Sequence, residues 1–499
     1  MKYSVLTFGC RVNQAESLAM ERELAGRGGV PVPAAEADVV LVNSCSVTAT
    51  ADQGTRQAIR RVARDNPDAR IVVTGCYATR RPDDLRGLPG VVRIVPNGRK
   101  DTIVADLADG DAGLPTTADR YAGEQGPCGA PELDASAEAM PPALVVRGAG
   151  LQPRSRDPLS ESAAAVLEAQ PAVSFGRAGD WRASGVPVQL LAPGMGGRTA
   201  FTLRVQTGCD EGCTYCIIPS TRGRARSTPV DDVVRELQRI EASGYREVTL
   251  TGVHLGAYGR DLSSTSSLSA LLLRAIQGTD RLLFRLGSLE PMDCSRGIVD
   301  LASASGRIAP AFHLPLQHAS TRMLNAMGRP YTIGAYAALV DAIRARLPHA
   351  SIGADVIVGF PGETEEDARL LREYLESSPL THLHVFPYSD RPGTPASRMQ
   401  PKVHGTAVRE RAAAVRAVGR ALSARFERSL AGRIRPGLTI DDGATVLIDN
   451  GLKVRVAAWR TASALRERGA AGLERNRRVR VRLDVDETGL RGEVTGIDD

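Results

Sequence analysis

The feature that most constrains this chain is a run of three cysteines, Cys209, Cys213 and Cys216, in the spacing C-x3-C-x2-C. It directly follows a strand-like segment, residues 201–206. Three thiolates so close together cannot all point into a hydrophobic core, but on a loop they can converge on one metal centre. With 8 cysteines in 499 residues, chance produces this spacing at a rate of roughly one in 500. The run therefore predicts a metal-binding loop.

The ligand count distinguishes two kinds of metal centre. Structural zinc takes four ligands, and no nearby cysteine or histidine completes a fourth position, since His254 is the next imidazole. Three thiolates suit a [4Fe–4S] cluster that leaves one iron open. We therefore expect an iron–sulfur cluster, with zinc as the alternative.

The same run, with the aromatic Tyr215 before its last cysteine, resembles the cluster loop of the radical S-adenosylmethionine (SAM) enzymes. The resemblance implies that the open iron holds the amino and carboxylate groups of SAM. It also implies that one electron from the cluster cleaves SAM to a 5′-deoxyadenosyl radical.

Three further cysteines lie in residues 1–105, where apolar runs alternate with helical patterns as in a small parallel α/β sheet. Cys10, Cys45 and Cys76 each close a predicted strand. The carboxyl ends of strands in an open parallel sheet lie along one edge, so these thiols are expected to meet there. The pattern favours a second three-cysteine cluster site over the alternative of small buried hydrophobic residues.

The segments around these cysteines resemble the N-terminal domain of the methylthiotransferases, radical enzymes that attach a methylthio group to tRNA or to a ribosomal protein. The resemblance is carried by the sequences TFGCRVNQAES, VNSCSVT and TGCY, at residues 7–17, 42–48 and 74–77. It implies two [4Fe–4S] clusters, one of which holds the sulfur, and a second SAM as methyl donor. It also implies a tRNA anticodon stem-loop as partner and an electron donor such as flavodoxin or ferredoxin.

The first of these segments also bears on the substrate. GCRVNQ resembles the branch that modifies carbon 2 of N6-threonylcarbamoyladenosine at position 37 of tRNA. Arg11 lies beside the second cluster, where a guanidinium can pair with the threonyl carboxylate. The alternatives are a methylthiotransferase for N6-isopentenyladenosine 37 or for a ribosomal protein and, more remotely, a non-enzymatic zinc or RNA-binding protein.

Residues 198–432 carry six strand and helix units, which predict an open three-quarter barrel of the radical SAM type. Barrel chemistry takes place at the carboxyl ends of the strands, where the Cys209 loop lies. Gly252, Gln317 and Gly359 follow the second, fourth and fifth strands, and the resemblance implies that they contact SAM with Tyr215. The family usually has Gln-Ser-Gly-Ser where this chain has residues 317–320, QHAS. We interpret His254 and His313 as core groups, and Cys294 as a buried thiol.

The remaining segments differ in composition. Residues 106–197, which include Cys128, are rich in Ala, Gly, Pro and Ser and predict a partly disordered insertion. Residues 433–499 alternate like strands and resemble the small RNA-binding (TRAM-like) β-barrel that ends these enzymes. Alternation places Arg478, Arg480 and Arg482 on one strand face, as an RNA-binding surface or a merely solvated one. A net charge of +6 permits a nucleic-acid partner, and without a signal segment or an apolar span we expect a cytoplasmic protein without membrane contact.

Overall fold

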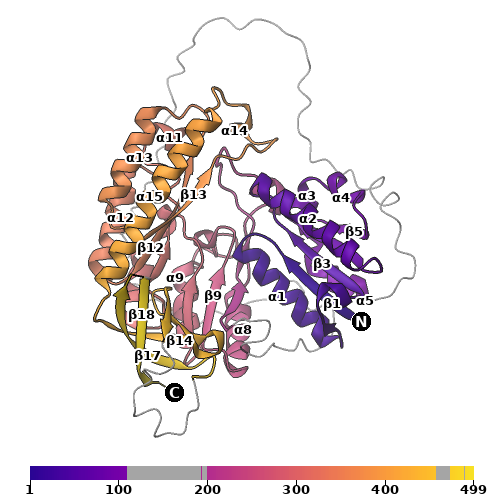
Figure 1. The fold of residues 1–499 in the computed structure, drawn as a ribbon. Coiled ribbons are helices and arrows are strands. Elements are labelled where there is room, and N and C mark those ends of the chain that lie inside the picture. The colour runs from indigo at the N-terminus through magenta and orange to yellow at the C-terminus, as the bar shows by residue number, and fades with distance from the viewer. Residues whose placement is uncertain (109–192, 194–198, 457–472, 488, 499) are drawn as a thin grey trace, which may run out of the picture.

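The computed structural model describes residues 1–108, 193, 199–456, 473–487 and 489–498. The predicted insertion at 106–197, with Cys128, lies almost entirely outside the described residues. Figure 1 shows an N-terminal α/β domain beside a larger α/β barrel, with a small yellow β-barrel packed below the latter. The three expected folds are therefore confirmed.

The N-terminal domain is built on a five-stranded parallel sheet in the order β2-β1-β3-β4-β5. The central strand β3 is buried at every residue, as expected for a hydrophobic strand covered on both faces. The short edge strand β2 is an addition to the four strands predicted from the sequence. The strands are β1 (Lys2–Thr7), β2 (Val30–Pro31), β3 (Val39–Ser44), β4 (Arg70–Gly75) and β5 (Val91–Val95).

Helices cover both faces of this sheet. Ile59 and Val62 of α2 belong to one hydrophobic core, and Met20 and Leu24 of α1 belong to the other. The Thr48 hydroxyl accepts a hydrogen bond from the Ala51 amide and so fixes the start of α2. The helices are α1 (Arg11–Gly26), η1 (Ala34–Glu36), α2 (Ala49–Asp65), α3 (Cys76–Arg80), α4 (Asp83–Arg86), η2 (Asn97–Thr102) and α5 (Ile103–Ala108).

The central domain has the six predicted parallel strands, arranged as β10-β9-β6 and β11-β12-β13. A parallel bridge between Phe284 and Ile308 and a hydrogen bond from the Leu289 amide to His313 join β10 to β11. No pairing joins β6 to β13 among the described residues, so the barrel is open between them. The strands are β6 (Phe201–Arg204), β9 (Glu247–Thr251), β10 (Leu283–Leu286), β11 (Ala311–His313), β12 (Ser351–Val358) and β13 (His382–Pro387). A small ribbon of β7 (Gln206–Thr207) and β8 (Arg226–Ser227) follows β6.

Helices surround the barrel and bury the outward residues of its strands in one large core. The loop after β6 ends in α7 (Ile218–Arg222), and the long α15 packs against β13. The other helices are α8 (Val230–Ala242), η4 (Leu255–Ala257), α9 (Leu268–Gln277), η5 (Pro291–Asp293), α10 (Arg296–Ser305), α11 (Thr321–Ala326), α12 (Ile333–Arg346), α13 (Glu365–Ser377), α14 (Pro395–Arg398) and α15 (Gly405–Ser429). Cys294 is fully buried in this core, as the sequence predicted.

The C-terminal domain is a closed barrel in the order β14-β15-β16-β18-β17. Four of its strands match the predicted ones, and β14 completes the closure by pairing with β15 and β17. The elements are β14 (Ile434–Ile440), η6 (Asp441–Gly443), β15 (Thr445–Ile448), β16 (Lys453–Val456), β17 (Arg478–Asp486) and β18 (Gly489–Ile497). Among the described helices, none combines the length and apolarity needed to cross a membrane.

Candidate active site at the carboxyl ends of the barrel strands

The cysteine loop after β6 is fixed by its backbone. Gly208 has a φ of 73°, and a Cβ atom there would lie 1.9 Å from the Arg224 carbonyl oxygen, so only glycine fits. The Cys209 amide donates to the Gly223 carbonyl (3.1 Å), and the Thr214 amide donates to the Met327 carbonyl (3.0 Å). These bonds hold the three cysteines on a rigid turn at the carboxyl end of the first strand.

Two side chains from other loops of the barrel, one after β9 and one after α11, contact the sulfurs of this loop. His254 Nδ1 lies 3.7 Å from Cys209 Sγ, and its Nε2 lies 2.6 Å from the Asp293 carboxylate. The Arg329 guanidinium donates to Cys213 Sγ over 3.2 Å. Burial opposes the protonation of His254, but its bonds to Asp293 and Cys209 raise its pKa to about 10. The sequence interpretation of His254 as a mere core group therefore missed its contact with a cysteine.

Charge around the three sulfurs is balanced. Arg329, of which 1% is exposed, forms an ion pair with Glu290. Burial raises the pKa of Cys216 to about 12, and it also raises the pKa of Cys213 against the opposing charge of Arg329. The free thiols of Cys213 and Cys216 are therefore protonated at neutral pH, and a bound metal centre has to displace their protons.

The cysteines of the N-terminal domain meet at one edge of its sheet, as predicted. Cys10 precedes α1, Cys45 follows β3, and Cys76 opens α3 directly after β4. Burial, together with the nearby Cys10 and Cys76, raises the pKa of Cys45 to about 11 against a backbone hydrogen bond from Val47. Gly9, with a φ of 89°, packs so closely on Cys45 that an added Cβ would lie 2.5 Å from its sulfur.

The donor chemistry of both triads fits an iron–sulfur cluster. A zinc ion with Zn–S bonds of about 2.3 Å would hold its thiolates about 3.8 Å apart. Among the described residues, neither triad has all three sulfur atoms within 4.8 Å of one another, which is wider than a shared single ion allows. Cys209, Cys213 and Cys216 would hold one cluster, and Cys10, Cys45 and Cys76 a second.

A buried carboxylate joins the two domains between these triads. Glu16 of α1, 4% exposed, accepts hydrogen bonds from Lys100 (2.6 Å), Arg204 (2.9 Å) and Arg222 (2.7 Å). These cations hold the pKa of Glu16 well below its usual range despite burial. Arg222 ends α7, which begins two residues after Cys216, and it also donates to the Asn13 side chain (2.5 Å). The Glu16 network thus ties the N-terminal triad to the barrel loop.

A second ion pair joins the domains on the other side of the barrel opening. Asp52 of α2 accepts from Arg80 of its own domain (2.7 Å) and from Arg391 of the segment after β13 (2.8 Å). Arg391 also donates to the Val47 carbonyl (3.2 Å). The N-terminal domain is therefore bound near both β6 and β13, the two strands that border the opening.

The residues predicted to contact SAM each have a different structural role in the loops where they lie. Gly252 packs against Gln206, whose amide donates to the Gly208 carbonyl (2.8 Å) and whose oxygen accepts from the His254 amide (2.9 Å). Gln317 has a φ of 64° and bridges to β12 through its backbone. The Tyr215 ring meets Phe360 edge to face. Contact of all four residues with SAM stays a prediction.

Gly359 has a structural reason of its own to be glycine. A Cβ on Gly359 would lie 2.5 Å from Val408 of α15, and its amide donates to Glu363 (2.7 Å). Helix packing and a φ of 75° therefore account for glycine here, and the approach of an adenine stays a prediction.

The basic residues chosen from the sequence fall in two places. Arg11 is solvent-accessible and follows Cys10 at the start of α1. Burial and the charge of Arg285 lower its pKa, while Glu247 raises it, so Arg11 lies within reach of the charges of these two barrel residues. Arg480 and Arg482 are exposed on β17, but Arg478 donates to the Arg246 and Arg281 carbonyls and holds the two barrels together.

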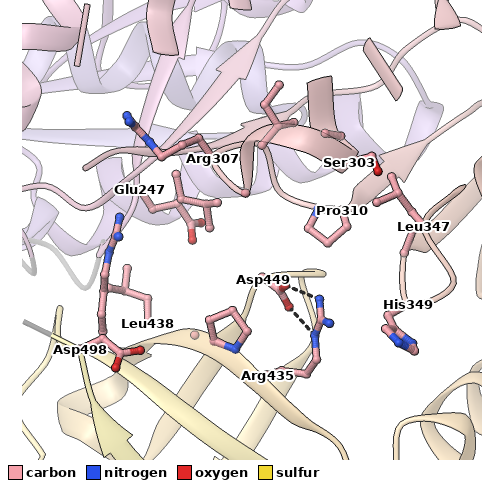
Figure 2. A pocket seen from close by; sticks show the side chains of 18 of the residues that line it. Glu247, Ser303, Arg307, Pro310, Leu347, His349, Arg435, Leu438, Asp449 and Asp498 are labelled. Atoms are coloured by element: carbon pink, nitrogen blue, oxygen red, sulfur yellow. Dashed lines mark hydrogen bonds and ion pairs between the residues drawn. The ribbon is translucent and has the colours of Figure 1, made fainter. Parts of the chain in front are cut away.

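A cavity of about 450 Å³ separates the central and C-terminal barrels. Figure 2 shows the Arg435–Asp449 ion pair on the side of the cavity that the C-terminal barrel forms, with Glu247 and Arg307 of the central barrel on the opposite side. Glu247 and Leu283 begin β9 and β10, so the cavity is at the amino ends of the strands. Chemistry in barrels of this kind takes place at the opposite ends, so this cavity is not the active site.

Comparison with known proteins agrees with this geometry. Residues 2–96 match the Uncharacterized protein family UPF0004, and residues 203–375 match the Radical SAM superfamily. The chain is 31% identical, over 81% of its length and 77% of the relative, to Threonylcarbamoyladenosine tRNA methylthiotransferase MtaB of Bacillus subtilis. It is 30% identical to the MtaB protein of Aquifex aeolicus over 93% of this chain and 99% of that one. The chain belongs to the radical SAM methylthiotransferase family.

Two other similarities qualify this result. The methylthiotransferase is also 34% identical, over 79% of its length and 78% of the relative, to tRNA-2-methylthio-N(6)-dimethylallyladenosine synthase of Opitutus terrae. Its fold resembles that of the radical S-adenosylmethionine methyltransferase TsrM of Kitasatospora setae, with a TM-score of 0.50 at 18% identity over 79% of this chain and 73% of that one. Membership of the family implies a [4Fe–4S] cluster and SAM as cofactors.

Several site residues of this methylthiotransferase were missed from the sequence. Gln206, Arg222 and Arg329 act through partners far away in the chain, and Glu16 looked like an ordinary residue of an amphipathic helix. The sequence offered one signal for Glu16, a charged residue on the apolar face of a predicted helix. Such a residue predicts a buried ion pair, because a buried charge needs a partner.

Proposed function

We propose that this methylthiotransferase adds a methylthio group to carbon 2 of N6-threonylcarbamoyladenosine at position 37 of tRNA. The observation that carries the proposal is the position of Arg11 at the start of α1, directly after Cys10 and within reach of the charges of Arg285 and Glu247 in the barrel. No ion pair or hydrogen bond joins Arg11 to any described residue, so its guanidinium is available to a substrate carboxylate.

The two cysteine triads divide the work in this proposal. A cluster on Cys209, Cys213 and Cys216 would supply, when loaded, the electron that cleaves SAM to a 5′-deoxyadenosyl radical. A cluster on Cys10, Cys45 and Cys76 would carry the sulfur. The chain itself orients the loop through Gln206, His254 and Arg329, and a flavodoxin or ferredoxin would deliver the electrons.

The C-terminal barrel would hold the anticodon stem-loop. Arg480 and Arg482 expose two cations on one strand face, and phosphate contacts of this kind supply most non-specific RNA affinity. Position 37 then has to leave its stack to reach a site inside the barrel, as other enzymes that modify bases require.

N6-isopentenyladenosine is the second candidate substrate, because the Opitutus terrae relative is named for the dimethylallyl counterpart and is 34% identical. An apolar isopentenyl group offers no partner to Arg11, which disfavours this candidate. Overall identity does not separate the two, since both kinds of relative lie near 30%.

Nucleoside mass spectrometry of tRNA from a deletion strain tests the function. We expect the methylthio form of threonylcarbamoyladenosine to disappear and to return with the wild-type gene, but not with a Cys209→Ala gene. Retention of that nucleoside with loss of the methylthio-isopentenyl form would overturn the substrate assignment.

A further inference from the structure

Three neighbouring strands of the barrel bring two histidines and an aspartate together at one point. His313 Nε2 lies 2.9 Å from Asp355 Oδ1, and His384 Nδ1 lies 3.0 Å from the same oxygen. The two imidazole rings are stacked with centroids 5.1 Å apart. The strand register accounts for this cluster, since Asp355 of β12 pairs with His384 of β13.

The cluster faces the lumen, the space enclosed by the inward residues of the six strands. Phe312, Ala354 and Val356 alternate with the cluster residues and pack in the core under the helices, so the cluster points the other way. His384 has 55% of its side chain exposed, against 24% for Asp355 and 20% for His313. These side chains are therefore open to a molecule inside the barrel.

Two arginines, Arg285 and Arg11, bring positive charge to the lumen, and they differ in their partners. Arg285 is held by the Glu247 carboxylate (2.6 Å) and by two carbonyls of the C-terminal barrel, Ile448 and Asp449. Arg11 approaches the same space from the N-terminal domain, and its charge acts on both Arg285 and His384. Asp355 and Glu247 already have partners, and no ion pair joins Arg11 to a carboxylate among the described residues.

His384 has a ring nitrogen that can donate a hydrogen bond to a carboxylate of a bound molecule. Asp355 accepts the hydrogen on Nδ1, and Nε2 has no hydrogen bond with any described residue. Asp355 raises the pKa of His384, with burial and Arg11 opposing, and the protonated ring donates from both nitrogens. His313 also packs on the ring face and so limits its rotation.

We propose that Arg11 and His384 form a two-sided binding site for a carboxylate group carried by the substrate, with Asp355 and His313 orienting His384. The proposal rests on the proposed function, because the threonyl group supplies that carboxylate. It adds a specificity site on the fifth and sixth strands to the one recognised beside Cys10. A neutral or apolar group at this position would leave both donors without an acceptor.

The test compares two anticodon stem-loops with the reconstituted holoenzyme. One carries N6-threonylcarbamoyladenosine, and the other carries its N-methylamide, in which the carboxylate is uncharged but similar in size. We expect the wild type to prefer the carboxylate by roughly ten- to a hundredfold in kcat/KM, the range that a charged hydrogen bond supplies. His384→Gln and Arg11→Gln should each reduce that preference to a few-fold, mainly through KM.

Matched variants separate binding from folding. His404→Gln changes an exposed histidine at the start of α15 and should keep the wild-type preference. Iron content and melting temperature show whether a variant has folded, and Arg11→Gln changes an accessible side chain with no described partner. Asp355→Asn should weaken the preference as well, because the amide no longer favours a charged His384.

The outcomes distinguish this site from the proposed function. A wild type that methylthiolates the carboxylate and amide substrates equally well would overturn the site while the function stands. A wild type that uses only isopentenyladenosine would overturn both. One equivalent of zinc in anaerobically purified protein, lost in Asp355→Asn, would instead identify a His2Asp metal site and overturn the carboxylate assignment.

Discussion

The two cysteine triads of this methylthiotransferase lie in different chemical surroundings. In the barrel, a cationic guanidinium and an imidazole contact Cys213 and Cys209, and each is paired with a carboxylate. In the N-terminal domain, the neutral Asn97 amide lies 3.6 Å from Cys76 Sγ. The charged groups there pair with Glu16 behind the cysteines. The barrel triad is thus tuned by direct contacts, while the N-terminal triad is positioned by the interface behind it.

This difference separates two tasks that one chain has to perform. Hydrogen bonds to sulfur change the reduction potential of a cluster, which matters where an electron is delivered to SAM. A cluster that carries the sulfur, as we propose for the N-terminal triad, depends more on its place relative to the substrate. The Glu16 and Asp52 ion pairs provide that place.

The largest expected effect comes from removing either triad. Replacement of Cys209, Cys213 and Cys216 by Ala should abolish SAM cleavage, because the cluster needs all three thiolates. Replacement of Cys10, Cys45 and Cys76 should halve the iron content and leave SAM cleavage measurable. Iron analysis and chromatography of 5′-deoxyadenosine check both results, and an unchanged iron content in the second variant would show that these thiols are only packing residues.

Glu16→Gln should have the next largest effect. It leaves Lys100 and Arg222 buried without their carboxylate, which costs about 3–5 kcal/mol of unfolding free energy. Glu23→Gln is the matched control on the same helix, since its pair with Arg27 is local and is worth about 0.5 kcal/mol or less. Urea unfolding measures both, and equal effects would refute the central place of Glu16.

The pH dependence should act on the two regions in opposite directions. Glu16 has a lowered pKa, so its contribution is present above pH 4.5 and is lost as the pH falls through the folded value. His254 has a pKa raised to about 10, so its contribution is complete below pH 6.5 and is lost as the pH rises towards 10. Hydrogen exchange of cluster-free protein should show α1 loosening in acid and the β9 loop loosening in base, each by a few kcal/mol. Loosening of both regions at the same end of the pH range would contradict this assignment.

Arg329→Lys should produce a smaller, spectroscopic effect. The lysine keeps the charge near Glu290 but loses the bond to Cys213, so the barrel cluster becomes harder to reduce, by on the order of 50 mV. Redox titration followed by electron paramagnetic resonance measures the shift. Arg80→Lys, beside Asp52, should leave that potential unchanged.

The smallest effect is expected at the C-terminal interface. Arg478→Ala removes bonds to two barrel carbonyls and should cost about 1 kcal/mol. Arg480→Ala should leave stability nearly unchanged and weaken tRNA binding. The binding constant of this variant should also depend less on salt concentration than that of the wild type. A larger loss of RNA affinity in Arg478→Ala than in Arg480→Ala would reverse the roles given to these residues.

The sequence predicted the strands and the cysteines at their ends because hydrophobic runs and strand ends are local properties. It missed β14, whose Pro436 and Gly437 look like a turn, because the pairing with β15 and β17 that makes it a strand is tertiary. It could not predict the bond between Glu16 and Arg222, which are 206 residues apart. The strand alternation that grouped Arg478 with Arg480 was right, but the neighbouring barrel takes the side chain of Arg478 and leaves that of Arg480 exposed.

The two ion pairs at the barrel opening have a consequence for how the reaction chamber comes into being. Asp52 and Arg391 are 339 residues apart, and they join the first domain to be synthesised to the end of the last barrel strand. The N-terminal domain is therefore bound to both sides of the barrel opening by residues that are far apart in the chain. A chain that ends before Arg391 would lack one of the two ion-pair networks that hold the N-terminal domain at the barrel opening. The architecture thus ties the most reactive chemistry of the protein to the completion of the chain.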